Sequence, residues 1–548
     1  MDKNRKITAV NIEWHNTHLH IELDVKEELD IEFFLVGTSI FDKPIKEQYP
    51  IELVRINNKN ILKLNITTVS NGRKPLDEGT WKICYETSEG IRSVNIDVAL
   101  AQRVIEMGRA FVYEEHYSYI FNFEVISNVE DESDIYLVFK IYYMMRNPKP
   151  KKRNPRVESR NITELIKNLI IKFLKFGINV FYIIVSRLSI RKGKNVLLIS
   201  ETRAPISGNL KFLDDRIKER GLDKKFNISY SFRRVLQDRP SVIFWARMVY
   251  LIARQDYVFV DDYIPVLGFI DVDKRTKIIQ VWHAGVGFKT VGYSRFGRQG
   301  CPAPFASCHR KYTHAIVASE NIIDVYQDVF GIEKEAIYPY GMPRLDNYLD
   351  EKKIAKFKED FYKEHPNMQN KKIILFAPTF RGKGQGYAYY NIGSIDTKKL
   401  YEVCGDEYIV LFKFHPFINE RVEIAKKYRD RLFEFTDYPD INELFYVTEV
   451  LITDYSSNIY EFSLFEKPII FYDYDKALYE VLRGVHHDID ENSPGVICAT
   501  FDEVLKVIEN GNFDYLKVKE FARKNHQLND NNACDRIIDN ILLGDKKL

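Results

Sequence analysis

Cysteine is scarce in this chain and is not spaced as metal ligands or disulfide partners usually are. Only six of the 548 residues are cysteine, and no two of them form a CxxC pair. A zinc ribbon and a disulfide framework are therefore not expected, and a reducing, cytosolic setting fits. No HxH motif with further ligands nearby occurs, so the sequence predicts no bound metal and no cofactor. The cysteines are Cys84, Cys301, Cys308, Cys404, Cys498 and Cys534.

Other missing features each exclude a class of protein. Without GxxxxGK[ST] or GxSxG, the chain lacks the usual support for a P-loop enzyme or a serine hydrolase. Its first residues are Met1, Asp2 and Lys3, followed by polar sequence and not by an apolar run, so no secretory signal is expected. The formal net charge is only +2, so the molecule as a whole does not look like a nucleic-acid-binding protein.

The sequence that is present divides into four segments. With 45% hydrophobic and 29% charged residues it is globular, and its length calls for several domains. Short strand-like runs separated by polar turns predict a small β-rich domain over 1–145. We expect a basic linker and an amphipathic helix over 146–194, and then two α/β lobes over 195–345 and 346–548.

The segment from Arg146 to Lys194 is the most uneven in charge. It holds 14 Lys or Arg residues against two acidic ones. Its apolar part is interrupted by charges such as Lys172 and Lys175, so no clean membrane span of about 20 uncharged residues exists. One interpretation is a peripheral helix on an anionic membrane surface. The alternative is a helix that packs against the protein core and carries a solvated basic rim.

From Asn195 onward, apolar runs alternate with helical segments, which is the pattern of parallel sheets. Two series of such runs predict two Rossmann-like lobes, with their junction near Tyr340 to Glu351 and a ligand cleft between them. The candidate strands are Asn195–Ser200, Asn227–Phe232, Tyr257–Val260, Lys277–Trp282, His314–Ala318, Lys372–Ala377, Tyr408–Phe414, Val450–Thr453, Pro468–Tyr472 and Gly495–Ala499.

Two of these strands end on a histidine. His283 follows Val281-Trp282 and precedes a glycine-containing loop, and His415 follows a strand that also carries Lys413. Ligands of parallel sheets bind beyond the carboxyl ends of strands, where a histidine can act as a base near neutral pH and a lysine can face negative charge. The alternative for each histidine is a buried imidazole that is hydrogen-bonded to a carbonyl.

The sequence Asp454-Tyr455-Ser456-Ser457 follows a third strand and precedes a helical segment. Its two hydroxyls can donate to a phosphate at the start of the helix, or they can simply cap that helix. Because capping needs only one such side chain, the doubled serine favours a phosphate site as much as a cap. Glu461 lies four residues further on, within reach of a ribose hydroxyl.

Three arginines in loops complete the candidate site. Arg381 follows a strand, Arg344 lies at the junction of the lobes, and Arg483 precedes a glycine. The forked guanidinium suits phosphate oxygens, so together these residues predict a basic rim around a nucleotide. Taken singly, each is more simply a surface salt-bridge residue.

These motifs, in this order and spacing, resemble those of the CDP-glycerol- and CDP-ribitol-dependent phosphotransferases that build bacterial teichoic acids. The resemblance extends from about Lys194 to Leu543, and a β-rich leader before the catalytic lobes looks like the ribitol-phosphate polymerase branch. The matching motifs are Trp282-His283, Phe288-Lys289-Thr290-Val291-Gly292, Gly341-Met342-Pro343-Arg344-Leu345-Asp346, Ala377-Pro378-Thr379-Phe380-Arg381, His415-Pro416 and Asp454-Tyr455-Ser456-Ser457.

The resemblance implies a GT-B-like fold, with the acceptor on the first lobe and the CDP-polyol on the second. Transfer of polyol phosphate would release CMP. His283 would be the base, while His415 and Arg483 would stabilise charge on the pyrophosphate. Ser456 and Ser457 would hold donor phosphates, and Asp454 would either orient this loop or take part in the chemistry.

The expected function is transfer of ribitol phosphate or glycerol phosphate to a lipid-linked acceptor by a peripheral enzyme on the cytoplasmic face of the membrane. Ala284-Gly285-Val286-Gly287 replaces the Gly-Thr-Pro run of the glycerol type, so the sequence leaves the polyol open. The alternatives are a GT-B nucleotide-sugar glycosyltransferase of cell-surface polysaccharide synthesis, and a polymer-binding scaffold without activity. The oligomeric state is also open.

Overall fold

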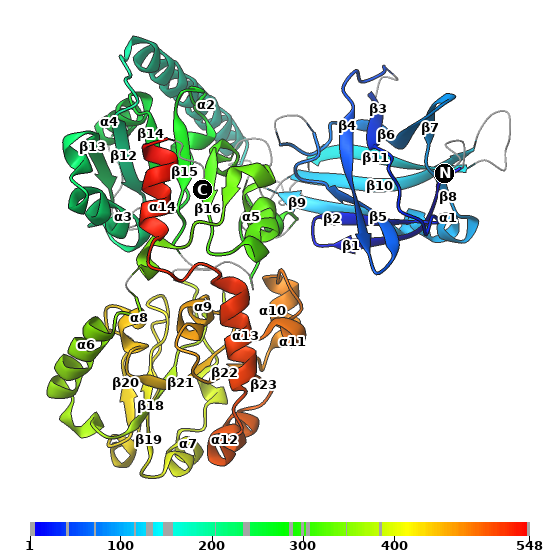
Figure 1. Cartoon of the computed structure of the whole chain (residues 1–548). Helices are drawn as coiled ribbons and strands as arrows, with labels where there is room; N and C mark the ends of the chain where they lie inside the picture. Colours follow the sequence, from blue (N-terminus) through cyan, green and yellow to red (C-terminus); the bar gives the residue numbers. More distant parts are fainter. Residues whose placement is uncertain are drawn as a thin grey trace.

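The structure is a computed structural model of the chain, in which three bodies are visible (Figure 1). A β-rich body comes first in the chain and two α/β lobes follow, so the predicted α/β class behind a β-rich domain is confirmed. The predicted linker over 146–156 lies outside the described residues. The structure describes residues 6–39, 43–70, 73–113, 117–127, 135–145, 157–202, 204–233, 242–283, 289–297, 301–302, 307–346, 348–382 and 386–544.

The first body is one curled sheet in the order β7-β6-β3-β4-β5-β2-β1-β8-β11-β10-β9. β6 pairs with β11 as well as with β3, so the sheet folds back on itself around one core. Along β2 the side chains alternate between buried and half-buried, as expected when one face of a strand lines a core. The elements are β1 (Thr8–His15), β2 (His18–Leu23), β3 (Phe33–Ser39), β4 (Tyr49–Ile56), β5 (Lys59–Asn65), β6 (Gly79–Thr87), β7 (Gly90–Ser93), β8 (Asn95–Ile96), α1 (Val98–Val104), β9 (Arg109–Tyr113), β10 (Tyr117–Ser127) and β11 (Ile135–Met145).

The first lobe is built on a six-stranded parallel sheet in the order β13-β12-β14-β15-β16-β17. Five of the six residues of β12 are buried, which is typical of a strand covered by helices on both faces of its sheet. The elements are α2 (Val157–Leu188), β12 (Asn195–Ser200), α3 (Gly208–Glu219), β13 (Asn227–Phe232), α4 (Val242–Ala253), β14 (Tyr257–Val260), β15 (Lys277–Gln280), β16 (His314–Ile316), α5 (Ile323–Phe330) and β17 (Ile337–Tyr338).

The second lobe is built on another six-stranded parallel sheet, in the order β20-β19-β18-β21-β22-β23. Its helices follow ordinary capping rules: α12 begins with a capping box between Thr500 and Glu503 and ends at Gly511 in the left-handed conformation. The elements are α6 (Glu351–Glu364), β18 (Lys372–Phe376), α7 (Thr397–Cys404), β19 (Tyr408–Phe412), β20 (Leu432–Glu434), α8 (Ile441–Leu444), β21 (Thr448–Thr453), α9 (Asn458–Ser463), β22 (Ile469–Tyr472), α10 (Lys476–Leu482), α11 (Ile489–Asn492), β23 (Val496–Cys498), α12 (Phe501–Asn510), α13 (Tyr515–Asn525) and α14 (Ala533–Ile537).

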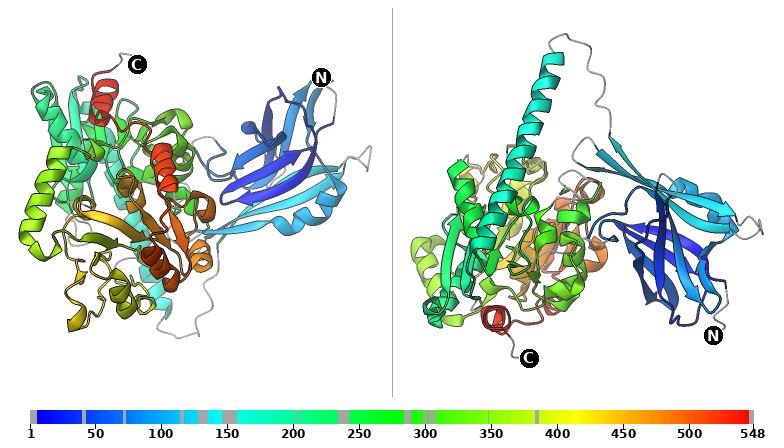
Figure 2. Two further views of the ribbon diagram at one scale, coloured as in Figure 1. Left: turned by 60° about the horizontal axis from the view of Figure 1, so that its bottom comes forward. Right: turned by 90° about the horizontal axis from the view of Figure 1, so that it is seen from above.

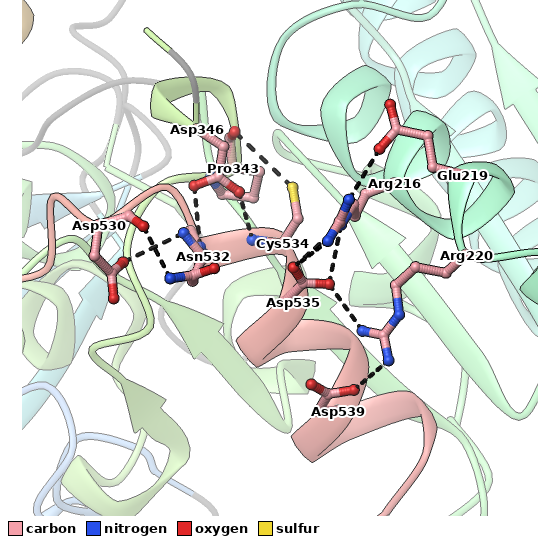
Figure 3. A network of polar contacts seen from close by, with 11 residues as sticks. Arg216, Glu219, Arg220, Pro343, Asp346, Asp530, Asn532, Cys534, Asp535 and Asp539 are labelled. Atoms are coloured by element: carbon pink, nitrogen blue, oxygen red, sulfur yellow. Dashed lines mark hydrogen bonds and ion pairs between the residues drawn. The ribbon is translucent and has the colours of Figure 1, made fainter. Parts of the chain in front are cut away.

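The last helix crosses back from the second lobe to the first. Ile537 and the residues after it are buried in the same core as strands β12 and β15. Figure 3 shows how α14 is fastened there: Arg216 and Arg220 of the first lobe both bind the Asp535 carboxylate, and Arg220 also binds Asp539. The sequence predicts that all of 346–548 belongs to the second lobe, but Ile537, Ile538, Ile541 and Leu542 are buried in the core of the first.

α2 extends beyond the body of the first lobe (Figure 2, right). Its C-terminal half is held against the lobe, because Tyr182 is buried, Asn179 donates to Asp271 at 2.7 Å and the Ser186 hydroxyl donates to a carboxylate. The N-terminal half of the described side chains is different, since Phe173 and Phe176 are 67% and 66% exposed. The interpretation of a helix that packs against the core therefore holds for the C-terminal half of α2.

By length and composition alone, part of α2 is also apolar enough to cross a membrane. The stretch Leu169–Leu188 has a mean hydropathy of 1.8, and only 11% of it is buried. The sequence-based prediction of no clean span rests on Lys172, Lys175 and Arg187, which interrupt this apolar run.

Candidate functional site

A cleft of about 380 Å³ lies between the two lobes, within the size range of ligand sites. Its walls come from the carboxyl ends of strands in both sheets, where ligands of parallel sheets bind. Seven of the ten predicted site residues line it: His283, Arg344, Lys413, His415, Ser456, Ser457 and Glu461. Other residues of the wall are Trp282, Lys289, Val291, Pro378, Thr379, Phe380, Phe414, Pro416, Ile441, Asn442, Tyr455, Asn458 and Tyr460.

His283 is presented to the cleft by an unusual backbone conformation at the residue before it. Trp282 has a φ of +50°, in the left-handed region that costs a bulky residue about 1 to 3 kcal/mol. Its carbonyl accepts a bond from the Asn209 amide at 2.8 Å, and its backbone N–H donates to Gln280 at 2.8 Å. The Trp282 ring stacks on the His283 imidazole, with centroids 4.6 Å apart. These contacts hold the chain in a turn that aims His283 away from the sheet.

The hydrogen bond of His283 defines which ring nitrogen can act as a base. Its Nδ1 lies 2.9 Å from the carbonyl oxygen of Asp261. A carbonyl can only accept, so Nδ1 carries the proton and the lone pair of the neutral ring is on Nε2. His283 therefore has the carbonyl partner of the simpler interpretation, but it lines the cleft in the tautomer that a general base requires.

His415 has the opposite tautomer. Its Nδ1 accepts a bond from the Phe417 backbone N–H at 3.1 Å, so the proton of the neutral ring is on Nε2. Burial, and then the charges of Lys289 and Lys413, lower the pKa of His415 to about 4. At neutral pH His415 is therefore an uncharged hydrogen-bond donor. One wall of the cleft thus offers an accepting imidazole nitrogen and the other a donating one.

Two lysines bring positive charge to the same cleft. The Lys413 amine donates to the Thr436 carbonyl at 2.6 Å, and burial lowers its pKa. Lys289 was part of a matching motif but was not predicted as a site residue. Burial, and then the neighbouring Arg483 charge, lower the pKa of Lys289 to about 8. An amine held in this state near a group of cations is arranged to receive an anion.

The two serines before α9 have different roles. The Ser456 hydroxyl accepts the Asn458 backbone N–H at 3.3 Å, so it satisfies a backbone donor at the start of the helix. Ser457 occupies the N-cap position, but its side chain makes no capping bond. Both line the cleft, and of the two hydroxyls only that of Ser456 bonds to the start of the helix.

Arg344 and Glu461 form an ion pair across the cleft floor, between the lobe junction and α9. The side chain of Asn209 connects this pair to His283, because its oxygen accepts the Arg344 backbone N–H at 3.0 Å while its amide donates to the carbonyls of Val281 and Trp282. Asn209 lies on α3, and no signal in the sequence distinguishes it from any other helical asparagine. The predicted contact of Glu461 with a ribose would have to share this carboxylate with Arg344.

Asp454 and Arg381 do not line the cleft, so the prediction that Arg381 binds the donor needs correction, while of the two roles predicted for Asp454 the structure favours orientation of the loop. Asp454 is fully buried, and it accepts the Thr379 backbone N–H at 2.7 Å and pairs with Arg381 at 3.0 Å. The Arg381 guanidinium also binds Asp475 through two bonds of 2.7 and 2.8 Å. With its guanidinium bound by two carboxylates, Arg381 supports the loop behind the cleft and does not bind a phosphate there. Asp454 orients that same loop.

Arg483 stands at the margin of the site. Its guanidinium lies 5.6 Å from the centre of the Phe380 ring, which is part of the cleft wall. Its carbonyl accepts the Thr290 hydroxyl at 2.5 Å, so the segment carrying Lys289 is tied to the second lobe. Among the residues that the structure describes, no group of three or more His, Cys, Asp or Glu side chains is arranged to hold a metal ion.

Comparison with known proteins identifies the family to which this site belongs. The profile of the family "CDP-Glycerol:Poly(glycerophosphate) glycerophosphotransferase" matches residues 180–543. The chain is 35% identical over 403 residues to the teichoic acid ribitol-phosphate polymerase TarL of Staphylococcus aureus, covering 73% of this chain and 70% of that protein. It is 36% identical over 383 residues to the teichoic acid poly(ribitol-phosphate) polymerase of Bacillus spizizenii, covering 70% of this chain and 61% of the relative.

A solved structure supports the same conclusion for the fold. The wall teichoic acid polymerase TagF superposes with a TM-score of 0.54 at 19% identity, over 69% of this chain and 96% of that one. The resemblance drawn from the strand-end motifs is thereby confirmed, including the ribitol-phosphate polymerase branch named by the curated relatives. The chain belongs to the CDP-glycerol:poly(glycerophosphate) glycerophosphotransferase family.

Proposed function

We propose that this protein transfers ribitol phosphate from CDP-ribitol to the growing end of a teichoic acid chain and releases CMP. The observation that carries the proposal is the pair of histidines with opposite tautomers on the two walls of one cleft, His283 with a lone pair on Nε2 and His415 with a proton there. Phosphoryl transfer needs an acceptor for the proton of the attacking hydroxyl and stabilisation of charge on the leaving phosphate.

In the proposed reaction, the two histidines act on opposite sides of the polyol-bearing phosphorus. The terminal hydroxyl of the acceptor loses its proton to Nε2 of His283 as its oxygen bonds to that phosphorus. The bond from the phosphorus to the bridging oxygen breaks, and CMP leaves with the electron pair. His415 donates a hydrogen bond to the phosphate oxygens, and Lys289 and Lys413 balance their charge.

In this proposal the donor binds on the second lobe. Ser456 and Ser457 would hold its phosphates together with the two lysines, and Arg483 would add positive charge at the margin. The strand order of the second sheet supports this proposal. When its strands are numbered along the chain, they lie side by side in the order 3-2-1-4-5-6, as in dinucleotide-binding sheets. With the likeness to TagF, this order supports two Rossmann-like lobes in a GT-B-like arrangement.

The choice of ribitol over glycerol rests on the relatives. Three that are named as ribitol-phosphate polymerases are 35, 36 and 37% identical to this chain, while one named as a poly(glycerol phosphate) polymerase is 30% identical. The test is to incubate the purified protein and a polyol-phosphate acceptor with CDP-ribitol, CDP-glycerol or a UDP-sugar and to measure the nucleotide released. CMP from CDP-ribitol supports the proposal, whereas UDP from a UDP-sugar would identify a glycosyltransferase instead.

We also propose that α2 holds the enzyme on the cytoplasmic face of the membrane, where a lipid-linked acceptor would be presented. Its exposed apolar side chains include Phe173 and Phe176, and Lys172 and Lys175 are interspersed among them, which suits an anionic lipid surface. Ile243 of α4, a helix packed against α2, is also 80% exposed.

The membrane proposal is tested by sedimentation with vesicles that contain phosphatidylglycerol. Reversing the charges in the variant Lys172→Glu with Lys175→Glu should release the protein from the vesicles. A matched control is Lys356→Glu with Lys398→Glu, which reverses two exposed lysines on the second lobe. Equal retention of both variants would contradict a role for α2 in membrane attachment.

A further inference from the structure

The β-rich body, which no part of the family match covers, grips a segment that lines the active-site cleft. The family profile begins at residue 180, so nothing in it gives this body a role. The gripped segment is 289–297, and it contains Lys289 and Val291 of the cleft wall. At its other end, Phe296 is only 4% exposed and is part of the core of the β-rich body and not of the lobe that carries it.

Phe296 is held by an aromatic pocket on strands β9 and β10. Its ring stacks on Phe111 with centroids 5.2 Å apart and lies 6.2 Å from Tyr113 and 5.7 Å from Tyr119. The next residue, Gly297, has a φ of +81°, and a Cβ there would come within 2.9 Å of the Phe111 ring. Glycine is therefore required at the point where the segment leaves the pocket.

The first residues of the segment and Ser294 contact the second lobe. Lys289 forms an isolated antiparallel bridge with Val485, and the Thr290 backbone N–H donates to the Gly484 carbonyl at 3.0 Å. The Ser294 hydroxyl lies 3.3 Å from Nε2 of His486. The segment is thus fixed by the second lobe near Lys289 and by the β-rich body at Phe296.

Polar contacts hold the β-rich body in this position. Arg310 donates to the Thr67 carbonyl at 2.7 Å and to the Tyr293 hydroxyl at 2.8 Å, so a single side chain joins the body to the gripped segment. His18 lies 2.5 Å from the Asp328 carboxylate on α5, on the face of the first lobe beside which the body lies (Figure 1).

We propose that the β-rich body is a positioning element of the active site, and that Phe296 in its aromatic pocket holds Lys289 in the cleft in the place where the donor's phosphates bind. This inference rests on the proposed function. Phe296 touches no reacting atom in this account and acts only through the segment that it anchors. Catalysis then requires the β-rich body to be docked on segment 289–297.

The charges around Lys289 give this anchoring a measurable signature. The charges of Arg483, Arg295 and Arg381 lower the pKa of this ammonium and the Asp454 carboxylate raises it, while His415 is close enough for the Lys289 charge to lower its own pKa. Burial and the arginines favour the uncharged amine, so the pKa of Lys289 is lowered to about 8. If the segment is released, water reaches the amine and its pKa rises toward the ordinary value.

The experiment compares Phe296→Ala with Phe123→Ala, a substitution of the same kind in the same core. Phe123 is 1% exposed and packs on Trp14, Phe121 and Phe139, so its loss removes a buried ring without touching the gripped segment. Circular dichroism checks that both variants fold. If either does not, the two leucine variants, Phe296→Leu and Phe123→Leu, are compared instead. The readouts are kcat and KM for CDP-ribitol against pH.

Phe296→Ala should lower kcat/KM for the donor at least tenfold, and it should move the alkaline limb of the pH profile upward by about one unit or more. Phe123→Ala should stay within twofold of the wild type with an unmoved limb. Equal effects of the two variants, or an unmoved limb in both, would overturn the inference while leaving the proposed function intact.

A second measurement separates the two hypotheses if the wild type releases no CMP from either CDP-polyol. In that case the proposed function fails, and amide hydrogen exchange of peptides covering 289–297 still decides the anchoring. Exchange should accelerate in Phe296→Ala and not in Phe123→Ala. Unchanged exchange in both variants would refute the anchoring directly.

Discussion

Replacing Arg381 with methionine separates a structural role from a substrate-binding one. The sequence predicts that this arginine binds the donor, whereas the structure places its guanidinium behind the cleft, bound to Asp475, Asp454 and the Thr379 carbonyl. Methionine fills the space of the aliphatic part of the Arg381 side chain but removes the charge, so two carboxylates lose their partner. Asp454 is 0% exposed and cannot recover the lost interaction from water.

The burial of Asp454 determines how much stability the Arg381→Met variant loses. Breaking a buried ion pair by removing one partner costs about 3 to 5 kcal/mol, which for a lobe of about 200 residues lowers the unfolding midpoint by roughly 6 to 20 °C. Adding Asp454→Asn and Asp475→Asn to the Arg381→Met variant neutralises both carboxylates. This should restore part of the lost stability, because no uncompensated buried charge is then left.

The assay is thermal unfolding followed by differential scanning calorimetry, together with donor KM measured well below the midpoint. Arg381→Met should unfold at lower temperature while the KM of the folded enzyme for CDP-ribitol stays within about twofold of the wild type. A donor KM raised tenfold with an unchanged midpoint would refute the reasoning, since it would mean that Arg381 binds the donor after all.

Three further predictions concern residues in the cleft. His283→Ala should reduce kcat by about 10² to 10⁴ with the circular dichroism spectrum unchanged, and undiminished CMP release would remove His283 as the base. Ser456→Ala with Ser457→Ala should raise the donor KM more than it lowers kcat, so a normal KM in steady-state kinetics would argue against a phosphate site there. In the wild type, kcat/KM for the donor should fall as the pH rises through about 8, because Lys289 then loses the proton that gives it its charge; a flat profile from pH 7 to pH 9.5 would contradict this.

The predicted strands of the first lobe agree closely with the structure. β12, β13 and β14 have the predicted bounds. β12 and β14 are short apolar runs that are largely buried. β13 is an edge strand whose residues are exposed or half-buried. β17 and β20 were not predicted, since two and three residues are too few to show a periodicity. Their pairing is imposed by the neighbouring strands.

The site was predictable where a local pattern carries the chemistry. A histidine directly after an apolar strand can be read from adjacent residues, and both His283 and His415 line the cleft. Arg381 could not be assigned in this way, because its partner Asp475 is 94 residues away in the chain and both possible roles place an arginine after a strand. The same limit applies to α14, whose Asp535 binds Arg216 across 319 residues.

Residues that only position other residues of the site could not be recognised in the sequence. Asn209 connects two backbone turns of the site, and Phe296 fills a pocket of a separate body, yet neither has a motif around it. Lys289 was visible only as part of a longer matching stretch. In each case the function depends on which distant segment lies opposite, and that is determined by the tertiary fold.

The most direct test of the central claim is the release of CMP from CDP-ribitol by the purified wild-type enzyme in the presence of a polyol-phosphate acceptor. We expect CMP release coupled to acceptor elongation, faster from CDP-ribitol than from CDP-glycerol, and slower by about 10²-fold or more in His283→Ala. Absence of CMP from both CDP-polyols, or turnover of a UDP-sugar in their place, would contradict it.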